Sequence, residues 1–131
     1  MEKIQKIIAV IGEADFEHMF FKGIEPADIL AAKSMIEKGV SFPVTFYDGE
    51  GKILFYAVFD HNDFYPDALH VNILTGHFLR FHQFFASFCF GLAKHHGKKK
   101  VTFKTKKRVV RNYAVVMGFE ANQYGDYERA V

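Results

Sequence analysis

The side chains best suited to chemistry by type and spacing are lysines and arginines in the second half of the chain. Residues 68–119 contain ten Lys or Arg and no Asp or Glu, whereas residues 1–67 carry 12 acidic and 6 basic side chains. Clustered cations attract phosphates, so they suit a nucleotide cofactor or a nucleic-acid backbone, with an ordinary solvated basic surface as the alternative. The densest group consists of Lys98, Lys99, Lys100, Lys104, Lys106, Lys107, Arg108 and Arg111.

Four other side chains invite a metal interpretation, and one thiol could react. His61, Asp63, His95 and His96 follow no defined ligand spacing, so the sequence predicts no metal site. Cys89 is the single cysteine and lies between two phenylalanines with no basic neighbour, which predicts a buried, unreactive thiol. Because one cysteine cannot form a disulfide within the chain, its use fits a reducing compartment, and we expect a cytoplasmic protein.

Length and composition predict one folded domain over residues 1–131. Half of the residues are hydrophobic and 16 are phenylalanine, which favours a packed core over disorder. No stretch approaches the ~20 apolar residues of a membrane span, so no membrane partner is expected. Sixteen phenylalanines exceed what a small core readily hides, which leaves room for an apolar patch that binds a protein partner or a second copy.

Three helices are predicted to position these side chains. Pro26 opens the first, which runs to Gly39. Residues 78–96 form the longest, and residues 107–117 form the last, which Gly118 ends in a left-handed cap. The core face predicted for the long helix consists of Phe81, Phe84, Phe85, Phe88 and Leu92.

The strands are predicted from runs of residues with high β-strand propensity that lie between typical turn residues. Residues 44–47 and 52–59 flank Asp48-Gly49-Glu50-Gly51, which is typical of a hairpin. Further strands are predicted at residues 68–74, 100–105 and 119–129, the last with a possible interruption at Gly125. Residues 3–12 are apolar and fit either a helix or a strand.

The order of these elements predicts an α/β (α+β) fold. A strand, a crossover helix and another strand imply a parallel pair, whereas the preceding hairpin is antiparallel. We therefore expect a mixed, mostly antiparallel sheet with helices on both faces.

This order, closed by Met117-Gly118-Phe119-Glu120, resembles the GNAT (Gcn5-related N-acetyltransferase) superfamily over about residues 26–131. The resemblance implies that acetyl-CoA binds between two splayed parallel strands, here residues 68–74 and 100–105. It also implies transfer of the acetyl group to an amine, whose identity the sequence does not give. The pyrophosphate would lie at the N-terminus of the helix at residues 78–96, which is a natural anion site.

The phosphate loop of the family departs from its usual pattern in this chain. Its glycine-containing motif falls on residues 77–82, where Arg80 and His82 stand at positions that small residues usually occupy. Gly76 allows an alternative loop one turn earlier. The resemblance thus implies cofactor contacts by Leu74, Thr75, Gly76, His77, Phe78, Leu79, Arg80, Lys107 and Arg111.

The catalytic residues implied by the resemblance are His70 and Tyr113. His70 alternates with apolar residues on its predicted strand, where it is either a general base toward the amine or a polar residue that bonds a neighbour. Counting back from Gly118 puts the usual general-acid tyrosine of the family on Ala114. Tyr113 lies one residue away, about 100° around the helix, which favours a packing role over a displaced acid.

A narrower resemblance leaves a second function open. Asp28-Ile29-Leu30, Ala32-Lys33 and Ser41-Phe42-Pro43 are similar to a stretch of the GNAT-like internal virion proteins of short-tailed phages. This similarity implies a catalytically silent structural or interaction protein, located in a virion. A basic module that binds phosphate or nucleic acid is a third reading of the charge pattern.

Overall fold

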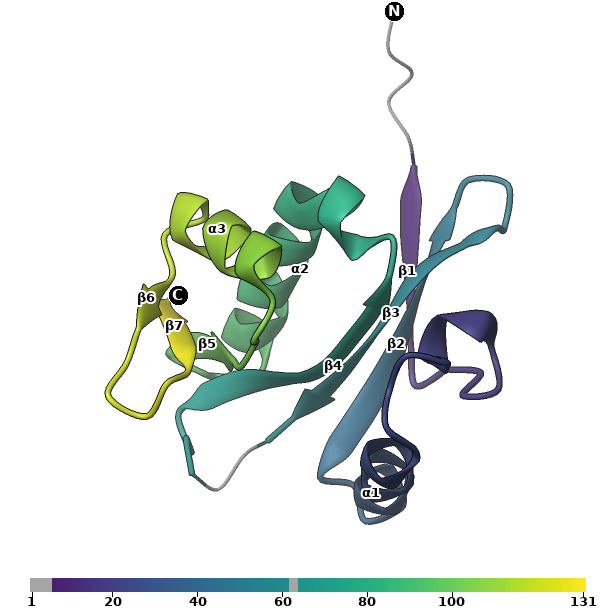
Figure 1. Cartoon of the computed structure of the whole chain (residues 1–131), viewed down its shortest axis with the longest axis horizontal. Coiled ribbons are helices and arrows are strands. Elements are labelled where there is room, and N and C mark those ends of the chain that lie inside the picture. The colour runs from purple at the N-terminus through teal and green to yellow at the C-terminus, as the bar shows by residue number, and fades with distance from the viewer. Residues whose placement is uncertain (1–5, 62–63) are drawn as a thin grey trace, which may run out of the picture. The chain divides into compact units, whose positions relative to one another are not determined.

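The computed structural model describes residues 6–61 and 64–131, which form two compact units (Figure 1). Among the described residues, the N-terminal unit comprises 6–59 and Ile73–Phe78, and the C-terminal unit comprises 60–61, 64–72 and Leu79–Val131. Strand β4 (Ala68–Gly76) contributes its first part to the C-terminal unit and its last part to the N-terminal unit. One domain over the whole chain stays a prediction.

The N-terminal unit is a β-sheet with one long helix. Its first strand resolves the ambiguity at residues 3–12 in favour of a strand, within the part of that stretch that the structure describes. The first two strands are antiparallel, with a register that runs from Ile7↔Asp48 to Ile11↔Val44. The elements are β1 (Ile7–Ile11), the 3-10 helix η1 (Met19–Phe21), α1 (Pro26–Glu37), β2 (Ser41–Asp48) and β3 (Ile53–Asp60).

The hairpin between β2 and β3 confirms the turn prediction. The Asp48 carboxylate accepts hydrogen bonds from the N–H groups of Glu50 and Lys52, both at 2.9 Å. Gly51 has a φ of +84°, which a glycine adopts without a steric penalty. The core of this unit lies between the sheet and α1, which packs against β2. Its buried cluster consists of Phe21, Ala32, Tyr56, Val58 and Ile73.

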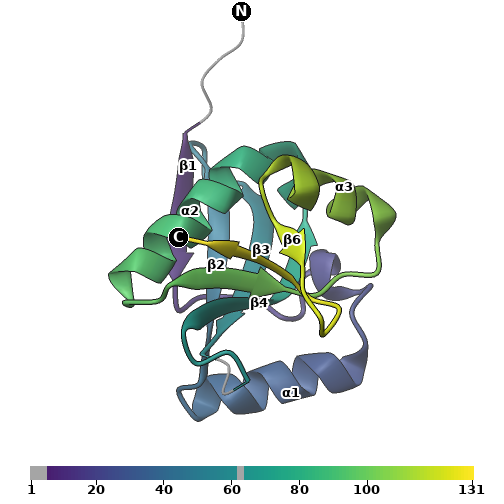
Figure 2. The ribbon, with the colours of Figure 1, turned by 90° about the vertical axis from the view of Figure 1, so that its left-hand side faces the viewer.

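The C-terminal unit contains the parallel strand pair. Strand β4 pairs with β5 in parallel, in a register from Ala68↔Lys100 to Val71↔Phe103, which confirms the crossover prediction. Strand β7 is antiparallel to β5 and to β6, and Figure 2 shows the β6–β7 end of the chain in yellow. The further elements are the 3-10 helix η2 (Phe78–Phe81), α2 (His82–His95), β5 (Lys100–Phe103), α3 (Arg108–Val116), β6 (Glu120–Ala121) and β7 (Tyr127–Ala130).

Two sequence-based expectations for this unit were wrong in detail. The long helix begins as the 3-10 helix η2, and its buried side chains are the small residues Ala86, Cys89 and Ala93 with Leu92, whereas Phe84 is exposed. Small residues let the backbone of α2 approach β5, against which it packs. The predicted final strand at residues 119–129 is instead a hairpin of β6 and β7.

The turn of that hairpin explains the second correction. The side-chain oxygen of Asn122 accepts hydrogen bonds from the N–H groups of Tyr124 and Asp126, at 3.0 and 3.1 Å. Gly125 has a φ of +82°, so it lies in the turn rather than in an interrupted strand. An asparagine and a glycine three residues apart are typical of such a turn.

The hydrogen-bonded neighbours follow the strand order β1-β2-β3-β4-β5-β7-β6, with β4 shared by the two units. The sheet is mixed and mostly antiparallel, with β4 and β5 as its parallel pair, as predicted. Among the described residues, none of the helices has the length and apolar character needed to cross a membrane.

Candidate functional site

His70 is positioned by the parallel strand pair of the C-terminal unit. It stands opposite Thr102 in the β4–β5 register, and its Nδ1 lies 2.8 Å from Thr102 Oγ1. Thr102 is fully buried and His70 is half-buried. Burial lowers the pKa of His70 below its ordinary value, although Asp60 and Asp126 oppose the shift. The imidazole is therefore neutral near pH 7, the state in which a histidine accepts a proton.

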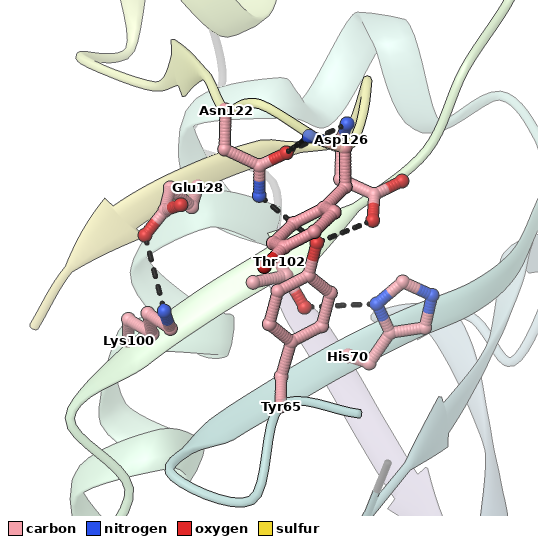
Figure 3. A network of polar contacts seen from close by, with 8 residues as sticks. Tyr65, His70, Lys100, Thr102, Asn122, Asp126 and Glu128 are labelled. Atoms are coloured by element: carbon pink, nitrogen blue, oxygen red, sulfur yellow. Dashed lines mark hydrogen bonds and ion pairs between the residues drawn. The ribbon is translucent and has the colours of Figure 1, made fainter. Parts of the chain in front are cut away.

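A polar network around Tyr65 borders His70 (Figure 3). The Tyr65 hydroxyl donates to the buried carboxylate of Asp126 at 2.6 Å and accepts from the Asn122 side-chain amide at 3.0 Å. Burial and the bond to Asp126 raise the pKa of Tyr65, so its hydroxyl stays protonated. The Tyr65 and His70 rings are nearly parallel, with centroids 6.4 Å apart. Sequence reasoning did not find this network.

Three of the clustered lysines make contacts within this unit. Lys100 Nζ lies 3.2 Å from Glu128 Oε2, and Lys104 Nζ lies 3.9 Å from Asp126 Oδ1. Lys98 donates to the Pro66 carbonyl at 3.0 Å. Carboxylates partly neutralise Lys100 and Lys104, whereas the carbonyl bonded to Lys98 leaves the charge of that lysine in place. Further exposed cations of the cluster that could meet a phosphate are Lys99, Lys106, Lys107, Arg108 and Arg111.

Tyr113 lies on α3 beside the first residue of α2. Its ring centroid is 4.4 Å from that of His82, whose Nδ1–H donates to the Leu79 carbonyl at 2.8 Å. This contact is compatible with the packing role that the sequence favoured for Tyr113, which stays a prediction. Ala114, at the position of the usual tyrosine of the family, is buried.

The predicted residues of α3 do not converge. Arg111 and Tyr113 are two residues apart, which separates their side chains by about 200° around the helix. Lys107 precedes the helix as its N-cap residue, in an extended conformation. Tyr113 contacts His82 and therefore lies on a different side of α3 from Arg111.

The predicted phosphate loop at residues 75–77 comprises the end of β4 and His77, and it is hydrogen-bonded within the N-terminal unit. The Thr75 hydroxyl donates to the Phe20 carbonyl, and the His77 N–H donates to the Leu54 carbonyl at 2.9 Å. Gly76 has a φ of +105°, and a Cβ there would lie 2.8 Å from the Phe55 Cα. Close packing against β3 thus accounts for this glycine without a phosphate. Leu74 and Phe78 are half-buried in the same segment.

The 3-10 helix η2, which leads into α2, carries the remaining predicted contacts, Leu79 and Arg80. Arg80 is exposed, with its guanidinium carbon 5.6 Å from the centroid of the Phe81 ring. Phe81 is the N-cap residue and forms no side-chain capping hydrogen bond. A helix start with a neighbouring cation and no side-chain cap suits an anion.

Two of the candidate metal ligands, His61 and His96, lie next to each other. The His61 and His96 rings lie 5.3 Å apart, and Asp63 lies outside the described residues. Over residues 6–61 and 64–131, no three His, Cys, Asp or Glu side chains are grouped so that they could hold a metal ion. Cys89 is buried, as predicted, and burial raises its pKa well above the ordinary value, which favours the protonated thiol.

Comparison with known proteins identifies the fold of this chain through solved structures alone. No protein-family model matches the sequence, and no curated protein matches it. Among solved structures, a GNAT-family acetyltransferase of Staphylococcus aureus Mu50 superposes with a TM-score of 0.69 at 10% identity, over 95% of this chain and 99% of that one. Escherichia coli YhbS, a GNAT-family N-acetyltransferase solved in complex with CoA, has a TM-score of 0.65 at 11% identity, over 99% and 84%. The chain has the GNAT fold.

A third similar structure contains an aminoacylated tRNA. AtaT complexed with acetyl-methionyl-tRNAfMet has a TM-score of 0.59 at 9% identity and covers 95% of each chain. At these identities the likeness concerns the fold. Within the GNAT fold of this chain, the β4–β5 register ends at Val71↔Phe103, while β4 itself continues to Gly76.

Proposed function

We propose that this GNAT-fold chain binds an acyl-CoA and transfers its acyl group to an amine. The observation that carries the proposal is the similarity to YhbS, solved with CoA, over 99% of the chain. The β4 strand supports it, because residues 72–76 extend beyond the register with β5. Backbone groups of such a strand can pair with an extended ligand.

The chain offers groups that fit an acyl-CoA in two places. The backbone of β4 around Leu74 would pair with the amide groups of the pantetheine arm. The 3-10 helix η2, with Phe78, Leu79 and Arg80, would lie at the phosphates before the start of α2. Arg80 would neutralise part of the phosphate charge, with Lys107 and Arg111 as further cations. Thr75, Gly76 and His77 would hold the end of β4 through their bonds and packing within the N-terminal unit.

His70 is the proposed base in this reaction. A bound acyl-CoA would supply the thioester that the amine attacks. If the His70 Nδ1–H donates to Thr102, the Nε2 atom is left unprotonated and can take the proton from the amine. With Ala114 at the usual tyrosine position and Tyr113 packed on His82, the leaving group would be protonated by solvent.

The experiment is a transfer assay with acetyl-CoA and a panel of amines, read as release of the free CoA thiol and as mass gain of the amine. We expect His70→Gln to lower the rate about 100-fold or more, the usual contribution of a general base. His95→Gln, an exposed histidine at the end of α2, is the matched control and should retain the rate. Equal loss in both variants would remove His70 from this role.

A second candidate is a GNAT-fold interaction protein without catalysis. It is favoured by Ala114, which is buried where the usual tyrosine of the family would stand, and by the His77 N–H, which is already bonded to Leu54. This candidate predicts no CoA release with any amine. If acetyl-CoA stabilises the fold but no product forms, the second candidate replaces the first.

A further inference from the structure

A surface hollow of about 500 Å³ opens on the C-terminal unit, between the loop before β4 and the β6–β7 turn. We propose that this hollow recognises a basic side chain, lysine or arginine, of a peptide or protein partner. The inference concerns binding alone, so it holds with or without acyl transfer. The lining residues that carry the argument are Phe64, Tyr65, Asp67, Lys100, Tyr124 and Glu128.

Aromatic rings line part of the hollow. Phe64 and Tyr124 are 60% and 53% exposed, and their rings meet edge-to-face with centroids 4.8 Å apart. Tyr65 stands perpendicular to Phe64, also at 4.8 Å. The exposed faces of such rings attract organic cations.

The charges that line the hollow favour a cation. Asp67 and Glu128 contribute two carboxylates and Lys100 one ammonium, which leaves one negative charge. Glu128 is paired with Lys100, whereas the Asp67 carboxylate has no hydrogen bond or ion pair with any residue that the structure describes.

The ammonium group of Lys100 already lies between a carboxylate and an aromatic ring that line the hollow. Its Nζ lies 3.2 Å from Glu128 Oε2 and 5.3 Å from the centroid of the Tyr65 ring. An aromatic face with a carboxylate beside it is the arrangement that a lysine or arginine from a partner would need. Hydrogen bonds to Asp126 and Asn122 fix the Tyr65 side chain in place. Less side-chain entropy is therefore lost when a ligand binds beside it.

The test is a titration of the full chain followed by backbone and aromatic NMR signals. The probes are the N-acetyl, N-methylamide derivatives of lysine and of arginine. We expect saturable shifts, with millimolar affinity, that map to Phe64, Asp67 and Tyr124. The norleucine derivative is the neutral control and the glutamate derivative is the anionic control. Equal binding of norleucine, stronger binding of glutamate, or no saturable shift with either basic probe would overturn the proposal.

Two variants are expected to change the affinity for the lysine probe in opposite directions. Asp67→Asn should weaken the lysine probe about two- to fivefold, as for loss of an exposed ion pair. Lys100→Met should strengthen it, because Glu128 and Tyr65 become available and a like charge is removed. Lys94→Met, an exposed lysine in the last turn of α2, is the control and should leave affinity unchanged. Weaker binding in a folded Lys100→Met protein would contradict a cation site. If that variant does not fold, Asp67→Asn decides, and unchanged affinity there overturns the proposal.

Discussion

At the scale of single residues, Gly76 and His70 show how one position can be read both structurally and functionally. Gly76 was expected to approach a phosphate, and the structure shows it against the backbone of Phe55. His70 was expected to be either a base or a polar sheet residue, and its contact with Thr102 is compatible with both. Each reading gives a measurable consequence for stability.

Replacing Gly76 by alanine should destabilise the protein by about 2–4 kcal/mol, because its φ of +105° and the 2.8 Å approach to the Phe55 Cα both oppose a side chain. Urea unfolding measures the change. Gly23→Ala is the control in the same unit, since a Cβ there meets nothing within 4 Å, and it should change stability by no more than about 0.5 kcal/mol. Similar losses in both variants would contradict the packing explanation.

The lowered pKa of His70 predicts a loss of stability in acid. Because burial disfavours its charged form, the folded chain binds this proton less readily than the unfolded chain. The contribution of His70 is therefore complete above the unfolded value of about 6.5 and is lost as the pH falls through the folded pKa. His61 has the same direction of shift and adds to the effect.

The measurement is the difference in unfolding free energy between about pH 7.5 and about pH 5. His70→Gln should reduce this difference, whichever effect it has on stability at the higher pH. His95→Gln should leave it unchanged. An unaltered difference in the His70 variant would show that this side chain is not the buried, neutral group that the structure describes.

At the scale of elements, sequence reasoning succeeded where the signals were local. The β2–β3 hairpin follows from Asp48 and Gly51 in its turn, and Gly118 ends α3 with a φ of +86°. The β6–β7 hairpin was missed because its strands are only two and four residues long, too short for a periodic pattern. The signal that could have found it is Asn122 followed by Gly125.

Asn122 should be required for that hairpin. Its side chain accepts two backbone hydrogen bonds of the turn and donates a third to the Tyr65 hydroxyl. Asn122→Ala should cost about 1–3 kcal/mol and speed amide exchange at residues 120–130. Gln123→Ala, an exposed neighbour in the same turn, is the control. Unchanged exchange in Asn122→Ala would contradict this role.

At the scale of the whole molecule, element order predicted the mixed sheet, because a crossover helix between strands implies a parallel pair. The GNAT fold itself was implied by the resemblance of that order and of Met117-Gly118-Phe119-Glu120 to the family. The polar network was not predictable in the same way. Tyr65 forms hydrogen bonds with Asn122 and Asp126, which follow it by 57 and 61 positions in the chain. No local sequence pattern predicts contacts at such separations. The basic cluster was visible in the sequence, but not that Lys98, Lys100 and Lys104 contact their own unit.

The central claim is that this GNAT-fold chain binds acyl-CoA, and thermal unfolding with acetyl-CoA tests it most directly. A ligand at about one hundred times its Kd should stabilise the folded chain by about 2.7 kcal/mol, which raises the Tm by several degrees. Arg80→Ala should reduce the rise through loss of a phosphate contact, and Lys94→Ala should not. A saturable rise at micromolar acetyl-CoA is the predicted result, and an unchanged Tm at millimolar acetyl-CoA would contradict the claim.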